Sequence, residues 1–281
     1  MIKDPAFIYL ATILPPILLG IVIWKSDKFP EPGKFLVASF LLGVSIIFPL
    51  DLFIRIAEDH IAPLLKIDLD SITAWNEGAW KEDDAVYPAA ARTFMSFFRA
   101  AFLEEGIKFA LLLFFCVRLS DLNEPMDAIV YGAAIGLGYA AIENVGYLMS
   151  SNYDAAWSIE MVKVRYYALI MHMGFGVLMG FLLSQNLFEE RSIFKRRLML
   201  IMSLALPVTF HGIYNYYGTA DIFPLLTLLF VIGVIYYFRR EQLNRITEQV
   251  DKSKVENIEV FYSYGSTLLL VILIVFSAII F

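Results

Sequence analysis

The sequence predicts an all-α, polytopic membrane protein: a bundle of about eight transmembrane helices forming one integral membrane domain over residues 1–281. Hydrophobic residues make up 59% of the chain and the mean hydropathy is +0.67, whereas soluble domains are about 45–50% apolar. The apolar residues fall into separate runs of about 20, the length that a helix needs to cross a bilayer. A net charge of −6 without a basic block argues against a nucleic-acid partner.

The apolar runs define the expected helices in chain order. The first contains Pro15 and Pro16 but no small-residue cleavage site, so we interpret it as a retained span and not as a removed signal peptide. The last two runs are short for a full crossing. The predicted spans are Ala6–Trp24, Phe35–Ile54, Phe97–Val117, Met126–Met149, Tyr166–Leu187, Leu198–Tyr217, Ile222–Phe238 and Ser266–Phe281.

Lysine and arginine in the connecting segments predict the orientation, because cytoplasmic loops are enriched in both. The segments after the first, third, fifth and seventh spans hold 13 of these residues, against seven on the other side. Both termini and the acidic, aromatic segment 55–92 are therefore expected on the extracytoplasmic side. That segment is interpreted as a solvated loop, or alternatively as a lid that docks a substrate. The charged segment 239–262 is expected to be a largely helical cytoplasmic connector.

The third predicted span carries two adjacent glutamates, Glu104 and Glu105, followed by Lys108. An ionisable group at membrane depth costs about 2.5–3.5 kcal/mol on insertion scales, so three of them within five residues indicate a function. On a helix Lys108 shares a face with Glu104 and also reaches Glu105. A carboxylate pair with one member neutralised supplies an acid and a base from the same residue type. The alternative is a salt-bridged packing cluster.

The fourth span carries Glu143 on a stripe of small residues. Gly132 and Gly136 are one turn apart and allow close helix approach, and the same stripe continues through Ala140 to Glu143. Glu143 is therefore expected to point into the bundle and not toward lipid, with Asn144 beside it in a supporting position. A purely structural ion pair is the alternative.

The fifth and sixth spans each carry a histidine, although the chain has only three. His172 heads another stripe of small residues, with Gly176 and Gly180 following at one-turn spacing. His211 is one turn before Asn215 and shares its face. Either histidine alone would more often be a satisfied core residue, but the two together with three glutamates favour a functional site.

Depth connects these residues. Glu104 and Glu105 lie about 7–8 residues, or about 10–12 Å, from the outer end of their span at about 1.5 Å per residue. Glu143, His172 and His211 each lie about six residues from the outer end of theirs. The orientation came from loop charges alone, yet four helices of alternating direction bring their polar groups to one level. This agreement predicts a single site within the membrane, near the outer surface.

These motifs resemble the PrsW-type intramembrane proteases, distant relatives of the CAAX prenyl endopeptidases of the Abi family. The resemblance covers roughly residues 94–217, which would be the catalytic core. In the aromatic-x-x-x-glutamate motif this chain has Tyr139 where phenylalanine is expected. The matching residues are Glu104, Glu105, Lys108, Tyr139, Glu143, His172 and His211.

The resemblance implies an intramembrane endopeptidase that makes the site-1 cleavage in a membrane-anchored anti-sigma factor. The implied partners are the lipid bilayer and a single-span membrane protein substrate. The implied location is the extracytoplasmic face of a bacterial inner membrane.

We interpret the reaction as hydrolysis of a peptide bond, with Glu104 preferred as the general base and Glu105 orienting the water or donating to the leaving amine. Lys108 would hold the charge state of both glutamates. Of the remaining site residues, Glu143 and His172 would hold water and substrate, and His211 and Asn215 would stabilise the oxyanion.

Two further readings remain open at this stage. The same hydrolysis could use Zn²⁺ held by Glu143, His172 and His211, with Glu104 or Glu105 as the base, although no His-Glu-x-x-His motif is present. The alternative to this zinc-dependent reaction is hydrolysis without any cofactor. Outside the proteases, a proton-coupled transporter uses the same buried residue types, and a non-catalytic membrane receptor could retain them.

Overall fold

The computed structural model describes residues 5–68, 70, 72, 88–119, 122–150, 155–189, 192–217 and 222–249, and these are almost entirely helical. The helical class is therefore confirmed. The third predicted span forms one continuous helical rod from three labelled segments: α6 (Ala89–Thr93), η3 (Phe94–Phe102) and α7 (Leu103–Phe114). The other long helices are α1 (Pro5–Ser26), α2 (Gly33–Ser45), α3 (Ile47–Ile56), α8 (Pro125–Ser150), α9 (Ala155–Leu187), α10 (Ile193–Tyr217) and α11 (Ile222–Gln249).

Five helical ranges in the described part of the chain are long and apolar enough to cross a membrane, against about eight predicted. The third predicted span is helical, but four charged residues lower its apolar character. A shorter apolar helix covers Ile13–Ser26, and the predicted span Ser266–Phe281 lies outside the described residues. The five ranges are Gly33–Leu64, Pro125–Tyr147, Val164–Leu187, Ile193–Tyr217 and Ile222–Asn244.

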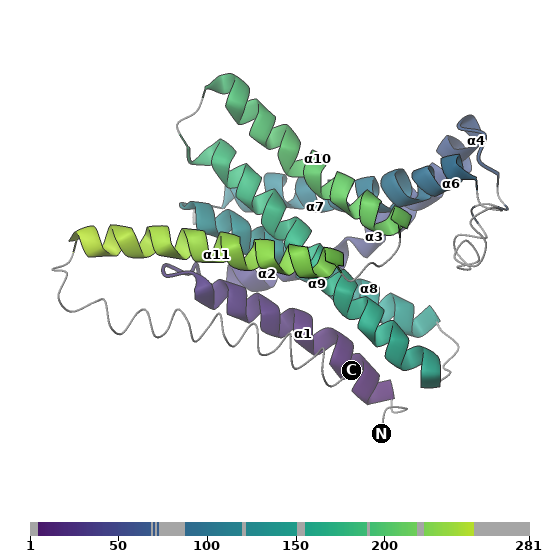
Figure 1. Ribbon diagram of the computed structural model, residues 1–281, viewed down its shortest axis with the longest axis horizontal. Helices are drawn as coiled ribbons and strands as arrows, with labels where there is room; N and C mark the ends of the chain where they lie inside the picture. The colour runs from purple at the N-terminus through teal and green to yellow at the C-terminus, as the bar shows by residue number, and fades with distance from the viewer. Residues whose placement is uncertain are drawn as a thin grey trace.

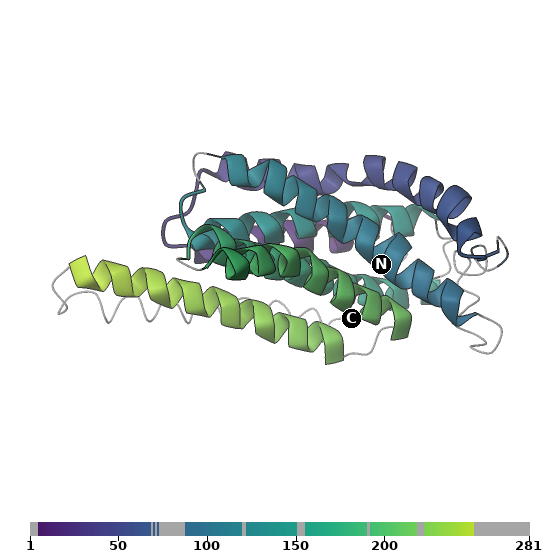
Figure 2. The ribbon, with the colours of Figure 1, turned by 90° about the horizontal axis from the view of Figure 1, so that it is seen from above.

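Helices α8 and α9 lie side by side at the centre of the bundle (Figures 1 and 2). Helices α1 and α2 pack against α8, and α10 and α11 pack against α9. The rod formed by η3 and α7 contacts α10 and, less extensively, α8. The most buried helices are therefore the two that carry Glu143 and His172.

Glycines allow the two central helices to approach each other, as the small-residue stripes predicted. A Cβ atom added to Gly132 would overlap the carbonyl oxygen of Gly176, and one added to Gly180 would overlap that of Ala128. A Cβ atom on Gly136 would overlap the carbonyl oxygen of His172. The close packing that places His172 beside α8 therefore requires a residue without a side chain, glycine, at position 136.

Replacing Gly136 with alanine is expected to lower the stability of the bundle by about 1–3 kcal/mol, because an overpacked contact forces the backbones apart. The measurement is thermal unfolding of the purified protein in detergent. Gly146→Ala, on the same helix, is the matched control, because a Cβ atom there meets nothing within 4 Å. Equal unfolding temperatures for the two variants would contradict this reading of the helix contact.

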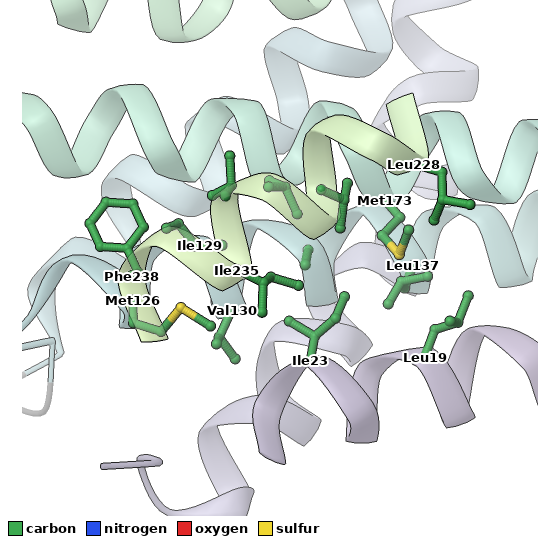
Figure 3. Close-up of a cluster of buried hydrophobic side chains, with 14 of the residues drawn as sticks. Leu19, Ile23, Met126, Ile129, Val130, Leu137, Met173, Leu228, Ile235 and Phe238 are labelled. Atoms are coloured by element: carbon green, nitrogen blue, oxygen red, sulfur yellow. The ribbon is translucent and has the colours of Figure 1, made fainter. Parts of the chain in front are cut away.

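Apolar side chains fill the space between α1, α8, α9 and α11 (Figure 3). Leu19 and Ile23 of α1 pack toward Leu137 of α8 and Met173 of α9, and Ile235 of α11 closes the cluster. The buried residues of α8 lie on several sides of the helix and not on a single face. This explains why its sequence is a continuous apolar run and not an amphipathic pattern.

Several predicted boundaries differ from the structure. The second span is prolonged past Ile54 through α3, η1 (Ala57–Ile61) and α4 (Ala62–Leu64), so part of the predicted segment 55–92 is helical. Helix α9 begins at Ala155 and not near Tyr166. Helix α11 continues to Gln249 into the predicted connector 239–262, whose remaining residues lie outside the described part, as do residues 73–87.

Candidate active site in the helical bundle

Helix α7 supplies a buried ion pair at the centre of the site. Lys108, which is 1% exposed, donates from Nζ to Glu105 Oε1 at 2.7 Å, and Glu105 is 0% exposed. The distance from Lys108 Nζ to Glu104 Oε2 is 3.9 Å. The sequence left open which glutamate the lysine neutralises, and the structure pairs it with Glu105. Breaking a buried pair of this kind leaves an uncompensated charge, which makes the pair a strong local constraint.

The two histidines meet this ion pair from the neighbouring helices. His211 Nδ1 of α10 lies 2.9 Å from Glu105 Oε1, and His172 Nδ1 of α9 lies 3.0 Å from Lys108 Nζ. Their ring centroids are 5.3 Å apart, edge to face. The aromatic ring of Phe175 stacks on His211, and Tyr139 lies beneath Lys108 Nζ at 4.3 Å from the ring centroid. Aromatic packing thus fixes both imidazoles around the lysine.

Glu104 differs from Glu105 in its partners. Its side chain is buried, yet Oε2 forms no hydrogen bond with any described residue, and the nearest histidine nitrogen, His211 Nε2, is 3.9 Å away. Glu105 uses Oε1 for Lys108 and His211, and its Oε2 is also without a hydrogen bond. A buried acceptor without a donor costs about 1–3 kcal/mol, so these oxygens are where water, substrate or a cation is expected.

Glu143 of α8 joins the site through His172, whose Nε2 lies 3.0 Å from Glu143 Oε2. Arg165 of α9 donates from Nη2 to the same carboxylate, and its Nε donates to Asn144 Oδ1 at 2.7 Å. The guanidinium, which is 5% exposed, lies over the ring of Tyr147. Asn144 therefore supports the arginine that holds Glu143.

Sequence reasoning missed Arg165, which it treated as a loop charge, because it placed the start of the fifth span one residue too late to include it. The signal that could have found it is spacing: Arg165 precedes His172 by seven residues, two helical turns, and so shares its face. Asn215 is half-buried one turn beyond His211, and no hydrogen bond links it to the other site residues within the described chain.

Four of the predicted site residues form a group that could hold a metal ion. One ligand atom from each of Glu104, Glu105, His172 and His211 lies within 4.8 Å of the others. Glu143, which the sequence offered as a zinc ligand, is hydrogen-bonded to one member of this group, His172, among the described residues. Carboxylate oxygens and imidazole nitrogens are zinc donors, and two buried carboxylate oxygens here accept no hydrogen bond from a described residue. The residues present therefore fit a zinc-type ion.

Comparisons with a family model and with individual known proteins agree on one family. The family model described as PrsW family intramembrane metalloprotease matches residues 31–240. The chain is 30% identical over 207 residues to Protease PrsW of Geobacillus kaustophilus, covering 73% of this chain and 77% of the relative. It is 30% identical over 211 residues to Protease PrsW of Bacillus subtilis, covering 75% and 82%. Protease PrsW of Oceanobacillus iheyensis is 27% identical over 242 residues, covering 84% and 96%. No solved structure matches the chain significantly.

Proposed function

Because the chain belongs to the PrsW family of intramembrane metalloproteases, we propose that it hydrolyses a peptide bond of a membrane-anchored protein at the buried group of Glu104, Glu105, His172 and His211. The family makes the protein a membrane-embedded enzyme with protease activity. The observation that carries the proposed site is the meeting of these four side chains, from three helices, within 4.8 Å. A transporter reading has no comparable support.

Glu105 and His211 are the residues that would hold a zinc-type ion, and His172 would join them through Nδ1. Binding at that nitrogen requires the ammonium of Lys108 to move away from it, because His172 Nε2 already donates to Glu143. Such an ion supplies a Lewis acid that polarises the scissile carbonyl and makes water nucleophilic at neutral pH. Lys108 and His211 occupy Glu105 Oε1, which leaves the buried Oε2 of Glu105 as the oxygen available to an ion.

Glu104 is the general base in this proposal, because its buried Oε2 has no hydrogen-bond partner and faces the same group. It takes a proton from the attacking water as the oxygen–carbon bond forms, and returns that proton to the leaving amide nitrogen as the carbon–nitrogen bond breaks. Glu105 cannot perform this role equally well, because the ammonium of Lys108 already occupies its other oxygen at 2.7 Å.

A chain of contacts orients His172. Arg165 holds Glu143, and Glu143 accepts from His172 Nε2, so the imidazole is fixed between a carboxylate and Lys108. Carboxylate partners of this kind set the tautomer and the ring orientation of functional histidines. Arg165 and Glu143 are therefore positioning residues. Asn215 shares the α10 face of His211, so its amide is the proposed donor to the oxyanion.

For the substrate, we propose a single-span membrane protein of the anti-sigma-factor type, cut near the extracytoplasmic face of a bacterial inner membrane, with both termini of the protease on that side. The support is the loop-charge asymmetry and the distance of about six to eight residues between each site residue and the outer end of its span.

The test is co-expression with a panel of tagged single-span membrane proteins that includes anti-sigma factors. A shortened product is expected with the wild type and absent with Glu104→Gln, with the new terminus mapping to the extracytoplasmic end of the substrate span. Products that are the same with both proteases would defeat the proposed site. A cut at the cytoplasmic end would defeat the proposed orientation alone.

Metal removal tests the ion separately. The purified protein is expected to contain about one zinc-type ion per chain by elemental analysis, and a strong chelator is expected to abolish cleavage until Zn²⁺ is restored. His211→Ala should lower the metal content in parallel with activity. Full activity of a metal-free, chelated sample would show that the glutamates act without an ion.

A further inference from the structure

A second group of buried carboxylates lies far from the site described above. Asp27 follows α1, Glu124 precedes α8, and Asp127 is in the first turn of α8. One carboxylate oxygen from each lies within 4.8 Å of the others. Asp127 and Glu143 are 16 residues apart on α8, which is about 24 Å at about 1.5 Å per residue. The two groups therefore lie toward opposite ends of the same helix.

Protein donors occupy one oxygen of each carboxylate. Gln242 of α11 donates from Nε2 to Asp27 Oδ1 at 2.8 Å and to Glu124 Oε1 at 2.6 Å. The backbone N–H of Asn123 and that of Glu124 both donate to Asp127 Oδ2 at 2.9 Å. These bonds hold the three side chains in place, but all of the donors are neutral, so they leave the negative charge uncompensated.

The second carboxylate oxygen of Asp127, Oδ1, indicates that a binding partner is missing. Asp127 is 1% exposed, and its Oδ1 has no hydrogen-bond partner among the described residues. No lysine or arginine in the described part of the chain forms an ion pair with any of the three carboxylates. The neighbouring Arg239 donates to the carbonyl of Ser26. Three carboxylates this close repel one another strongly unless a cation or a proton is shared between them.

We propose that Asp27, Glu124 and Asp127 bind one hard divalent cation of the Mg²⁺ or Mn²⁺ class, which joins the ends of α1, α8 and α11. An all-oxygen donor set selects such ions over zinc. Ligand oxygens at about 2.1 Å from a Mg²⁺ ion are about 3.0–4.2 Å apart, which is compatible with the spacing of this group. Water molecules complete the coordination of Mg²⁺ where the protein supplies only three ligands.

The position of the group gives the cation a structural consequence. Met126 of α8 and Phe238 of α11 close the apolar cluster between α1, α8, α9 and α11 (Figure 3). Asp127 follows Met126 directly in the chain, and Gln242 lies one turn after Phe238. Within the part of α11 whose side chains are described, Gln242 alone is hydrogen-bonded to the group. A bound cation would therefore fasten α1 to α8 and, through Gln242, hold the end of α11 against both.

Mn²⁺ is the probe for this site, measured by the loss of its free electron paramagnetic resonance signal on titration with the full chain in detergent at neutral pH. The wild type is expected to bind Mn²⁺ here, and Asp127→Asn is expected to weaken that binding at least tenfold. Glu241→Gln is the matched control, because it removes the same charge from α11 beside Gln242 but outside the group. The double variant Glu105→Gln/Lys108→Met disables the other metal group and should retain this Mn²⁺.

Two results would overturn the proposal. One is Mn²⁺ binding that is equal in Asp127→Asn and Glu241→Gln. The other is Mn²⁺ binding that disappears in the Glu105→Gln/Lys108→Met variant and persists in Asp127→Asn. That result would assign the bound Mn²⁺ to the group of Glu104, Glu105, His172 and His211. A shared proton would then relieve the repulsion among Asp27, Glu124 and Asp127. If Asp127→Asn fails to fold, Asp27→Asn replaces it with the same expectations. Mn²⁺ should also raise the unfolding temperature of the wild type, and not that of the Asp127 or Asp27 variant.

Discussion

Replacing Glu104 with glutamine is expected to lower kcat by about 10²–10⁴-fold, the usual contribution of a general base. The amide keeps the size of the side chain but cannot take a proton from water. Glu104 Oε2 has no hydrogen-bond partner among the described residues, so the protein should fold normally. The measurement is single-turnover cleavage of a purified membrane substrate by the purified variant.

Asp51→Asn is the control for this prediction, because Asp51 is exposed and its one ion-pair partner among the described residues is the exposed Arg55. It should cleave at the wild-type rate. Retained cleavage in Glu104→Gln, with loss only in Glu105→Gln, would exchange the proposed roles of the two glutamates. Retained cleavage in both variants would remove the carboxylates from the mechanism.

The largest expected effect on stability comes from Lys108→Met. Lys108 is the only lysine or arginine that pairs with Glu105 in the described part of the chain, and both side chains are fully buried. Removing one partner of a buried ion pair costs about 3–5 kcal/mol, because the other charge remains without compensation. Thermal unfolding in detergent measures this loss, and cleavage should disappear with it.

The double variant Glu105→Gln/Lys108→Met separates stability from activity. It removes both charges together, so most of the lost stability should return, whereas cleavage should not. Lys195→Met is the control, since Lys195 is exposed on α10. A single variant as stable as the control, or a double variant that cleaves, would contradict the role assigned to this ion pair.

The predicted ranges of the long helices agree well with the structure in their central parts, because about 20 apolar residues are needed wherever a chain crosses lipid. The ends agree less well. Helix α9 starts 11 residues before the predicted span, because a helix can extend beyond the apolar layer, where composition no longer constrains it. The rod of η3 and α7 is helical throughout. Its charged site residues reduce its apolar character, so hydropathy alone identifies it less well as a span.

Within the site, residue identity and depth predicted that Glu104, Glu105, His172 and His211 would lie at one level, and the structure brings them within 4.8 Å. The partner of each side chain could not be predicted in the same way. Helical spacing allowed Lys108 to reach either glutamate, and rotamers and neighbouring helices decided for Glu105. These choices depend on differences of about 1 Å, which a helical projection does not resolve.

The chain's own composition and spacing determined that it is a helical membrane protein, because the bilayer imposes length and burial on every span independently. The same spacing predicted that its polar residues share one depth. Only the tertiary structure decided that Arg165 holds Glu143, that Lys108 belongs to Glu105, and that Asp27 meets Glu124 and Asp127. These are contacts between residues brought together by helix packing. Their energy depends on distance and burial, neither of which is encoded in a local sequence pattern.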